Sequence, residues 1–120
     1  MPHENRIVIG IVGPCGAGKT TLARRLKELG YYARHIAQEH SYVPKMWKRI
    51  VNPDVLIYLD ASYPVCTRRR ALNWTESEYA EQLQRLRDAR ACADLLIQTD
   101  HLTPEEILKL VLNFLSRFDP

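Results

Sequence analysis

The chain has 120 residues, of which 46% are hydrophobic and 26% charged, and its formal net charge is +3. This length predicts a single domain over residues 1–120, and the small net charge gives no reason to expect nucleic acid as a partner. The longest apolar runs are strand-sized and the N-terminus MPHENR is polar, so we expect neither a membrane span nor a signal peptide. Three widely spaced cysteines without a C-x-x-C pattern favour a reducing cytoplasm over a disulfide framework or a zinc site.

A phosphate-binding motif stands near the N-terminus. Residues 7–12 form a short apolar, β-branched run that predicts a buried strand. The next eight residues, GPCGAGKT, match the pattern G-x-x-x-x-G-K-[ST] at every fixed position; we call residues 13–20 the phosphate loop. Leucines then recur with helical spacing up to Gly30, which suits a helix C-terminus. Strand, loop and helix therefore follow in the order that the motif requires.

The residue types of this loop explain how it would bind phosphate. Glycines let the backbone curl so that N–H groups face phosphate oxygens, and the following helix adds the positive end of its dipole. Lys19 can reach the β- and γ-phosphates, and the Thr20 hydroxyl can ligate Mg²⁺. The predicted nucleotide-binding residues of this segment are Gly13, Pro14, Cys15, Gly16, Ala17, Gly18, Lys19, Thr20 and Thr21.

The middle of the chain predicts two further strands. Residues 31–37 alternate loosely and end in the polar trio Gln38-Glu39-His40. A short helix is expected after Pro44. Residues 55–59 form a near-continuous apolar run that ends at Asp60, which predicts a strand buried on both faces.

Three helices and a fourth strand are expected in the second half. The first helix starts at 62–64 and carries three successive arginines, 68–70. Thr75 and Glu78 form a capping box that opens a helix ending near Ala93, and residues 95–97 read as the fourth strand. Thr103-Pro104-Glu105-Glu106 combines a helix cap with a proline in the first turn, and the helix that follows has a broad apolar stripe.

This alternation predicts an α/β fold with three layers, in which helices cover both faces of a parallel sheet of about four strands. In such sheets the ligand lies beyond the carboxyl ends of the strands. We therefore expect the phosphate loop, Glu39, Asp60 and the turn 99–101 to gather along one edge of the sheet.

Beyond the phosphate loop, two segments carry a family resemblance. VLIYLDASYPVCTRRR and QRLRDARACADLLIQTD are similar to the corresponding regions of P-loop NTPases that act as kinases of nucleotides and other small molecules. The resemblance covers most of the chain and implies ATP as substrate, with GTP as the alternative, and Mg²⁺ as cofactor. It also implies base contacts from residues 98–101, including Asp100, and lid arginines that touch the transferring phosphate; the candidates are Arg68, Arg69, Arg70, Arg87 and Arg90. The chain departs from this family in one place, because another strand and an acceptor-binding insertion usually precede the strand at 55–59.

The acid beside the phosphate loop has two candidates. Glu39 follows the strand expected to lie next to the first one, so it can hold Mg²⁺ or position a water, although an exposed loop carboxylate is the competing interpretation. Asp60 ends a more strongly predicted strand, but it could also cap the helix that follows. The predicted catalytic residues are Lys19, Glu39, Asp60, Arg68 and Arg69, and the predicted metal ligands are Thr20 and Glu39.

Three functions fit these observations. The first is a kinase-like phosphotransferase that moves the γ-phosphate of ATP to a nucleotide or small-molecule acceptor. The second is a minimal NTPase or switch without an acceptor, which the missing insertion favours. The third is a non-catalytic nucleotide-binding module. The acceptor site of the phosphotransferase could be minimal, or a second subunit or another protein could complete it, and the sequence does not name an acceptor.

Overall fold

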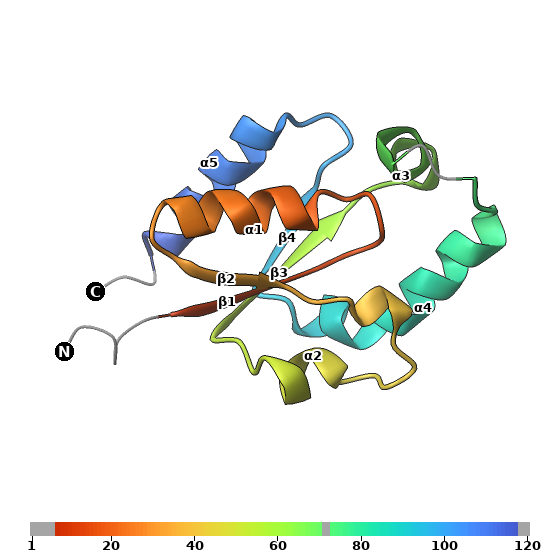
Figure 1. The fold of residues 1–120 in the computed structure, drawn as a ribbon, viewed down its shortest axis with the longest axis horizontal. Coiled ribbons are helices and arrows are strands. Elements are labelled where there is room, and N and C mark those ends of the chain that lie inside the picture. Colours follow the sequence, from red (N-terminus) through yellow and green to blue (C-terminus); the bar gives the residue numbers. More distant parts are fainter. Residues whose placement is uncertain (1–6, 71–72, 118–120) are drawn as a thin grey trace.

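A computed structural model of the chain describes residues 7–70 and 73–117. Four parallel strands form one sheet in the order β2-β1-β3-β4, and their bounds are β1 Val8–Val12, β2 Tyr32–His35, β3 Val55–Asp60 and β4 Leu95–Gln98. Figure 1 shows helices on both faces of this sheet. The predicted α/β fold with a four-stranded parallel sheet is confirmed.

The helices divide between the two faces (Figure 1). On one side lie α1 (Lys19–Glu28) and α5 (Pro104–Leu115), and on the other lie α2 (Met46–Ile50) and α4 (Glu76–Cys92). The remaining helix, α3 (Tyr63–Arg70), follows β3 at the carboxyl edge of the sheet. Each face has its own apolar cluster, because the strands β1 and β3 are buried on both sides and send alternate side chains to each.

The strand order reverses direction at β1, and this reversal positions the site. The chain leaves β1 through α1 to reach β2 on one side, and then returns across the sheet to β3 on the other side. At such a point the loops that follow neighbouring strands separate and leave a crevice beyond their carboxyl ends. The phosphate loop follows β1, and a short 3₁₀ helix, η2 (Gln38–His40), follows β2.

Local predictions and structure differ in a few places. The second strand is shorter than the predicted 31–37, because the backbone turns into η2 after Ile36, whose N–H still donates to the carbonyl of Ile11 at 2.8 Å. Helix α2 begins at Met46, and Pro44 lies in the turn before it. Both predicted capping boxes are present, at Thr75 and at Thr103. Among the described residues, no helix is long and apolar enough to cross a membrane.

Candidate functional site

The phosphate loop adopts the curled backbone that its glycines permit. Gly16 has φ 94°, and Gly18, the N-cap of α1, has φ 103°. No side chain caps this helix start and no acidic residue stands in its first turn. Because the first N–H groups of a helix have no carbonyl partner within it, the start of α1 offers free donors and a positive dipole end to an anion.

Lys19 is buried and already engaged. Its ammonium donates to the carbonyl of Gly13 at 2.6 Å and to that of Pro14 at 3.4 Å, and it forms an ion pair of 2.6 Å with Glu39 Oε2. The two side chains are only 7% and 5% exposed. Each charge is thus neutralised by the other out of contact with water, and removing either partner would leave a buried charge uncompensated.

The neighbouring strands bring Glu39 to Lys19. β2 pairs with β1 in parallel, with Ile11 opposite His35, so η2 emerges beside the phosphate loop. Gln38, fully buried, anchors this turn: its Oε1 accepts from the N–H of Trp47 at 2.9 Å and its Nε2 donates to the carbonyl of Val43 at 2.8 Å. Glu39 is therefore a fixed, buried carboxylate and not an exposed loop residue.

The donor set beside Lys19 fits Mg²⁺. Glu39 Oε1 is buried, and no described residue forms a hydrogen bond to it. Thr20 is exposed and lines the same cavity as Glu39. A carboxylate and a hydroxyl oxygen are ligands that Mg²⁺ accepts, since it completes its octahedron with waters and phosphate oxygens. Thr20 and Glu39 are thus the residues that could hold this ion.

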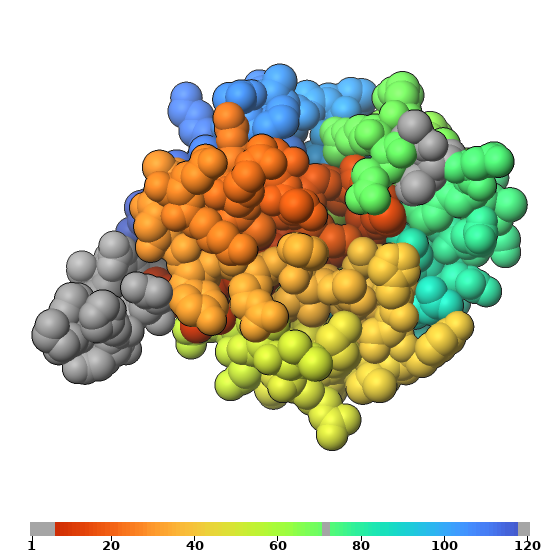
Figure 2. Space-filling model, in the orientation of Figure 1, coloured from red at the N-terminus to blue at the C-terminus, as the bar shows by residue number. Residues whose placement is uncertain are grey.

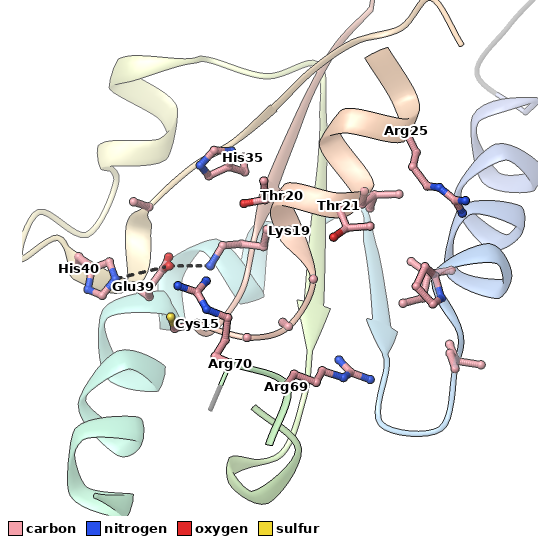
Figure 3. Close-up of a pocket in the computed structure, with 18 residues that line it drawn as sticks. Cys15, Lys19, Thr20, Thr21, Arg25, His35, Glu39, His40, Arg69 and Arg70 are labelled. Atoms are coloured by element: carbon pink, nitrogen blue, oxygen red, sulfur yellow. Dashed lines mark hydrogen bonds and ion pairs between the residues drawn. The ribbon is translucent and has the colours of Figure 1, made fainter. Parts of the chain in front are cut away.

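A cavity of about 470 Å³ lies over the phosphate loop. Figure 3 shows Lys19 and Glu39 paired at one part of it, with Thr20 and His35 nearby, and Arg25 at the far end. Figure 2 shows the loop, in red, between α3, in green, and the segment after β2. The apolar part of the wall comes from Leu22, Leu102, Pro104 and Ile107. The cavity wall therefore has a charged part at Lys19 and Glu39 and a largely apolar part at Leu102, Pro104 and Ile107.

Two predicted carboxylates lie outside this wall. Asp60 ends β3 and approaches Arg90 at 4.0 Å, so it belongs to the side of the sheet that α4 covers. Asp100 Oδ1 accepts from the N–H of Ser62 at 2.9 Å, just before α3. Burial raises the pKa of Asp100, but hydrogen bonds from Ser62 and Gln98 outweigh it, and the pKa lies below its usual value. From the end of β4 onward, the cavity is lined by Leu102, Pro104 and Ile107 and not by residues 98–101.

The three successive arginines 68–70 have different surroundings. Arg69 donates to Thr99 twice, from Nη1 to Oγ1 at 3.0 Å and from Nη2 to the carbonyl at 2.6 Å. Arg70 points toward the Lys19–Glu39 pair (Figure 3). Both line the cavity, whereas Arg68 and the more distant Arg87 and Arg90 are not part of its wall.

Sequence reasoning missed several residues at or behind the site. His35 and Arg25 line the cavity, and Gln82 of α4 accepts the N–H of Cys15 at 3.0 Å. A signal for Gln82 existed, because it lies three residues after Tyr79 and four before Leu86, on the face that α4 turns to the core. A polar residue in the middle of an apolar helix face needs a buried partner.

Comparisons with known proteins agree with this geometry. Residues 9–56 match the family model of an AAA domain. The fold resembles shikimate kinase from Acinetobacter baumannii in complex with shikimate, with 17% identity, a TM-score of 0.66, and coverage of 97% of this chain and 96% of that one. It also resembles shikimate kinase from Bacteroides thetaiotaomicron (12% identity, TM-score 0.60, 92% and 98% covered). An uncharacterized protein from Eubacterium ventriosum is similar as well (8% identity, TM-score 0.59, 92% and 99% covered). No curated protein matches the sequence.

At these identities the solved structures establish the fold alone. Together with the AAA-domain match they confirm the resemblance to small P-loop kinases that the sequence predicts. The chain contains a P-loop domain with a kinase-like fold.

Proposed function

We propose that this domain binds a nucleoside triphosphate with Mg²⁺ in the cavity over the phosphate loop and acts on its γ-phosphate, as a kinase-like phosphotransferase. The observation that carries the proposal is the buried Lys19–Glu39 pair at the start of α1, with Glu39 Oε1 left free of described partners. Phosphoryl transfer needs mainly positioned charge, and this pair supplies both signs at one place.

Each part of the cavity has a role in this proposal. The N–H groups at the start of α1 bind phosphate oxygens, and Lys19 moves its hydrogen bonds from Gly13 to the β- and γ-phosphates. Glu39 and Thr20 hold Mg²⁺, which neutralises phosphate charge. The apolar residues Leu102, Pro104 and Ile107 suit an uncharged ring such as a nucleobase. ATP is the proposed nucleotide on the family resemblance, with GTP as the alternative.

Hydrolysis without an acceptor is the second candidate, and one observation favours it. Residues 36–54, which join β2 to β3, contain only η2 and the short helix α2. Helix α4 packs directly against η2, through hydrogen bonds from Arg85 to the Glu39 carbonyl and from Gln38 to the Arg85 carbonyl. This packing occupies the side of Glu39 that faces away from the cavity. Among the described residues between β2 and β3 there is therefore no inserted acceptor-binding element, and a small-molecule acceptor would need a site in the cavity or one that a second subunit or partner protein completes.

The first test is a calorimetric titration of ATP, GTP, ADP and AMP with Mg²⁺ on the wild type and on Lys19→Ala. Lys27→Ala, an exposed lysine at the end of the same helix, is the matched control. We expect triphosphate binding that Lys19→Ala abolishes and Lys27→Ala retains. Absence of binding to the wild type would overturn the proposal.

Product analysis separates the two candidate reactions. Wild-type protein is incubated with Mg²⁺, ATP and a panel of nucleotide and metabolite acceptors, and inorganic phosphate and phosphorylated acceptor are both measured. A phosphorylated acceptor supports the phosphotransferase. Release of inorganic phosphate alone, unchanged by any acceptor, supports the NTPase.

A further inference from the structure

Helix α4 does not line the cavity, yet it contacts two of the segments that form it. Gln82 Oε1 accepts the N–H of Cys15, in the phosphate loop, at 3.0 Å. One turn later, Arg85 Nη1 donates to the carbonyl of Glu39 at 3.2 Å. Cys15 and Glu39 are both cavity residues, whereas Gln82 and Arg85 are not. One face of α4 therefore contacts both the loop after β1 and the turn after β2.

These contacts are held in place from several sides. Gln82 is 6% exposed, and Leu86 and Ala89 continue the same buried face. The Arg85 guanidinium lies 4.5 Å from the centroid of the Tyr42 ring and donates to the Tyr42 hydroxyl at 3.0 Å. Because a buried amide without a partner is costly, an apolar residue would suit position 82 better if it served packing alone.

The Cys15 peptide is turned toward α4 by this arrangement. Its N–H is used by Gln82, so it is not one of the donors left for phosphate. The donors that remain begin further along the loop and continue into the first turn of α1. Gln82 therefore fixes the position of the start of the phosphate loop relative to Glu39. Glu39 pairs with Lys19 at the other end of the loop.

We infer that Gln82 is a positioning residue: its side chain fixes the Cys15 peptide, and with it the phosphate loop, against the turn that carries Glu39. The inference about loop geometry stands on the contacts above. Its consequence for turnover rests on the proposed function. A misplacement of reacting groups by about 1 Å can cost about 10²-fold in rate, so the position of this peptide matters for catalysis.

The reactivity of the Cys15 thiol tests the inference without any nucleotide. Cys15 is partly exposed and lines the cavity, so its thiol can be alkylated. Cys66 is buried, and burial raises the pKa of its thiol to about 11, which makes it slow to react. Cys92 is exposed and is replaced in the background Cys92→Ser. Alkylation rates at Cys15 and Cys66 are then read separately by peptide mass spectrometry with iodoacetamide as the probe.

The decisive comparison is Gln82→Met against Gln84→Met, the same substitution at an exposed position of the same helix. We expect Gln82→Met to raise the Cys15 alkylation rate by about two- to tenfold, the factor in an opening equilibrium that one net hydrogen bond provides. Gln84→Met stays at the background rate.

Turnover supplies the second readout. With Mg²⁺ and ATP we expect Gln82→Met to lower kcat at least about tenfold while KM changes much less, because positioning acts on the transition state more than on ground-state binding. Equal Cys15 rates in Gln82→Met and Gln84→Met would overturn the inference, whether or not the protein binds nucleotide. A parallel rise at Cys66 would show general loosening and overturn it too. A rise confined to Cys15, in a protein that binds no nucleotide, would support the inference while the proposed function fails.

Discussion

Lys19 and Glu39 lie 2.6 Å apart, ammonium to carboxylate, with both side chains almost completely buried. The lysine also donates to the carbonyl of Gly13, so its hydrogen bonds are already used within the protein. An entering triphosphate must share this lysine with Glu39. Charge on Glu39 therefore stabilises the free protein and, without Mg²⁺, opposes the binding of a polyanion.

Removing the charge of Glu39 while keeping the size of its side chain tests both effects, on stability and on nucleotide binding. We expect Glu39→Gln to lower the free energy of unfolding by about 2 kcal/mol, because a buried ammonium loses its counter-charge but keeps a hydrogen-bond acceptor. The same variant should bind ATP more tightly than wild type in EDTA, and Mg²⁺ should no longer improve its affinity. Chemical denaturation and calorimetry measure both effects. Glu28→Gln, exposed at the end of α1, should change neither; a wild-type-like response to Mg²⁺ in Glu39→Gln would contradict the assignment.

The proposed phosphotransferase activity gives different expected roles to two neighbouring arginines. Arg70 lines the cavity and points toward the Lys19–Glu39 pair (Figure 3), whereas Arg68 is exposed outside the wall. We expect Arg70→Met to reduce turnover by about 10²-fold or more, as removal of a charge-stabilising group from a phosphoryl-transfer site does. Arg68→Met serves as the matched control. Its turnover should stay within about a factor of two of the wild-type value, because substitutions of exposed residues away from a site have small effects. The reverse order of effects would reject Arg70.

Two glycines with the same φ angle allow the cost of a left-handed backbone to be separated from the cost of a steric clash. Gly16 and Gly30 both have φ 94°. A Cβ on Gly16 would lie 2.7 Å from the carbonyl oxygen of Cys66, while a Cβ on Gly30 meets nothing within 4 Å. We expect Gly30→Ala to cost about 1–2 kcal/mol of stability, the price of a left-handed alanine, and Gly16→Ala to cost about 2–5 kcal/mol. Equal losses in urea denaturation would show that α3 does not press against the loop.

The lowered pKa of Asp100 predicts that the stability of the protein depends on pH. Its pKa is lowered in the folded protein because hydrogen bonds from Ser62 and Gln98 outweigh the effect of burial. The charged form is then favoured by folding, so its contribution is fully present above the unfolded value of 3.8 and disappears as the pH falls through the lower folded value. We expect the stability difference between wild type and Asp100→Asn to be constant near neutral pH and to shrink below about pH 4. A difference that stays the same down to pH 2 would show that the charge of Asp100 contributes nothing.

Much of the architecture follows from local sequence signals. The phosphate loop needs only its own glycines, a preceding β-branched run and a following helical pattern, and the capping boxes at Thr75 and Thr103 lie within four residues. The apolar run of β3 is buried on both faces, as a continuous hydrophobic segment requires. These features depend on neighbours in the chain, and for that reason the pattern of residues predicts them.

What the sequence by itself determined is therefore the alternation of strands and helices and the position of the phosphate-loop motif between the first strand and the first helix. Only the tertiary structure decided which acid meets Lys19: β2 pairs with β1, so Glu39 lies beside the loop, while Asp60 faces the side of α4. It also decided that Gln82 supports Cys15 across 67 positions of sequence. Contacts at such separations depend on strand order and on how helices pack. The helical spacing of Gln82 indicates that it is buried, but it does not indicate which residue is its partner.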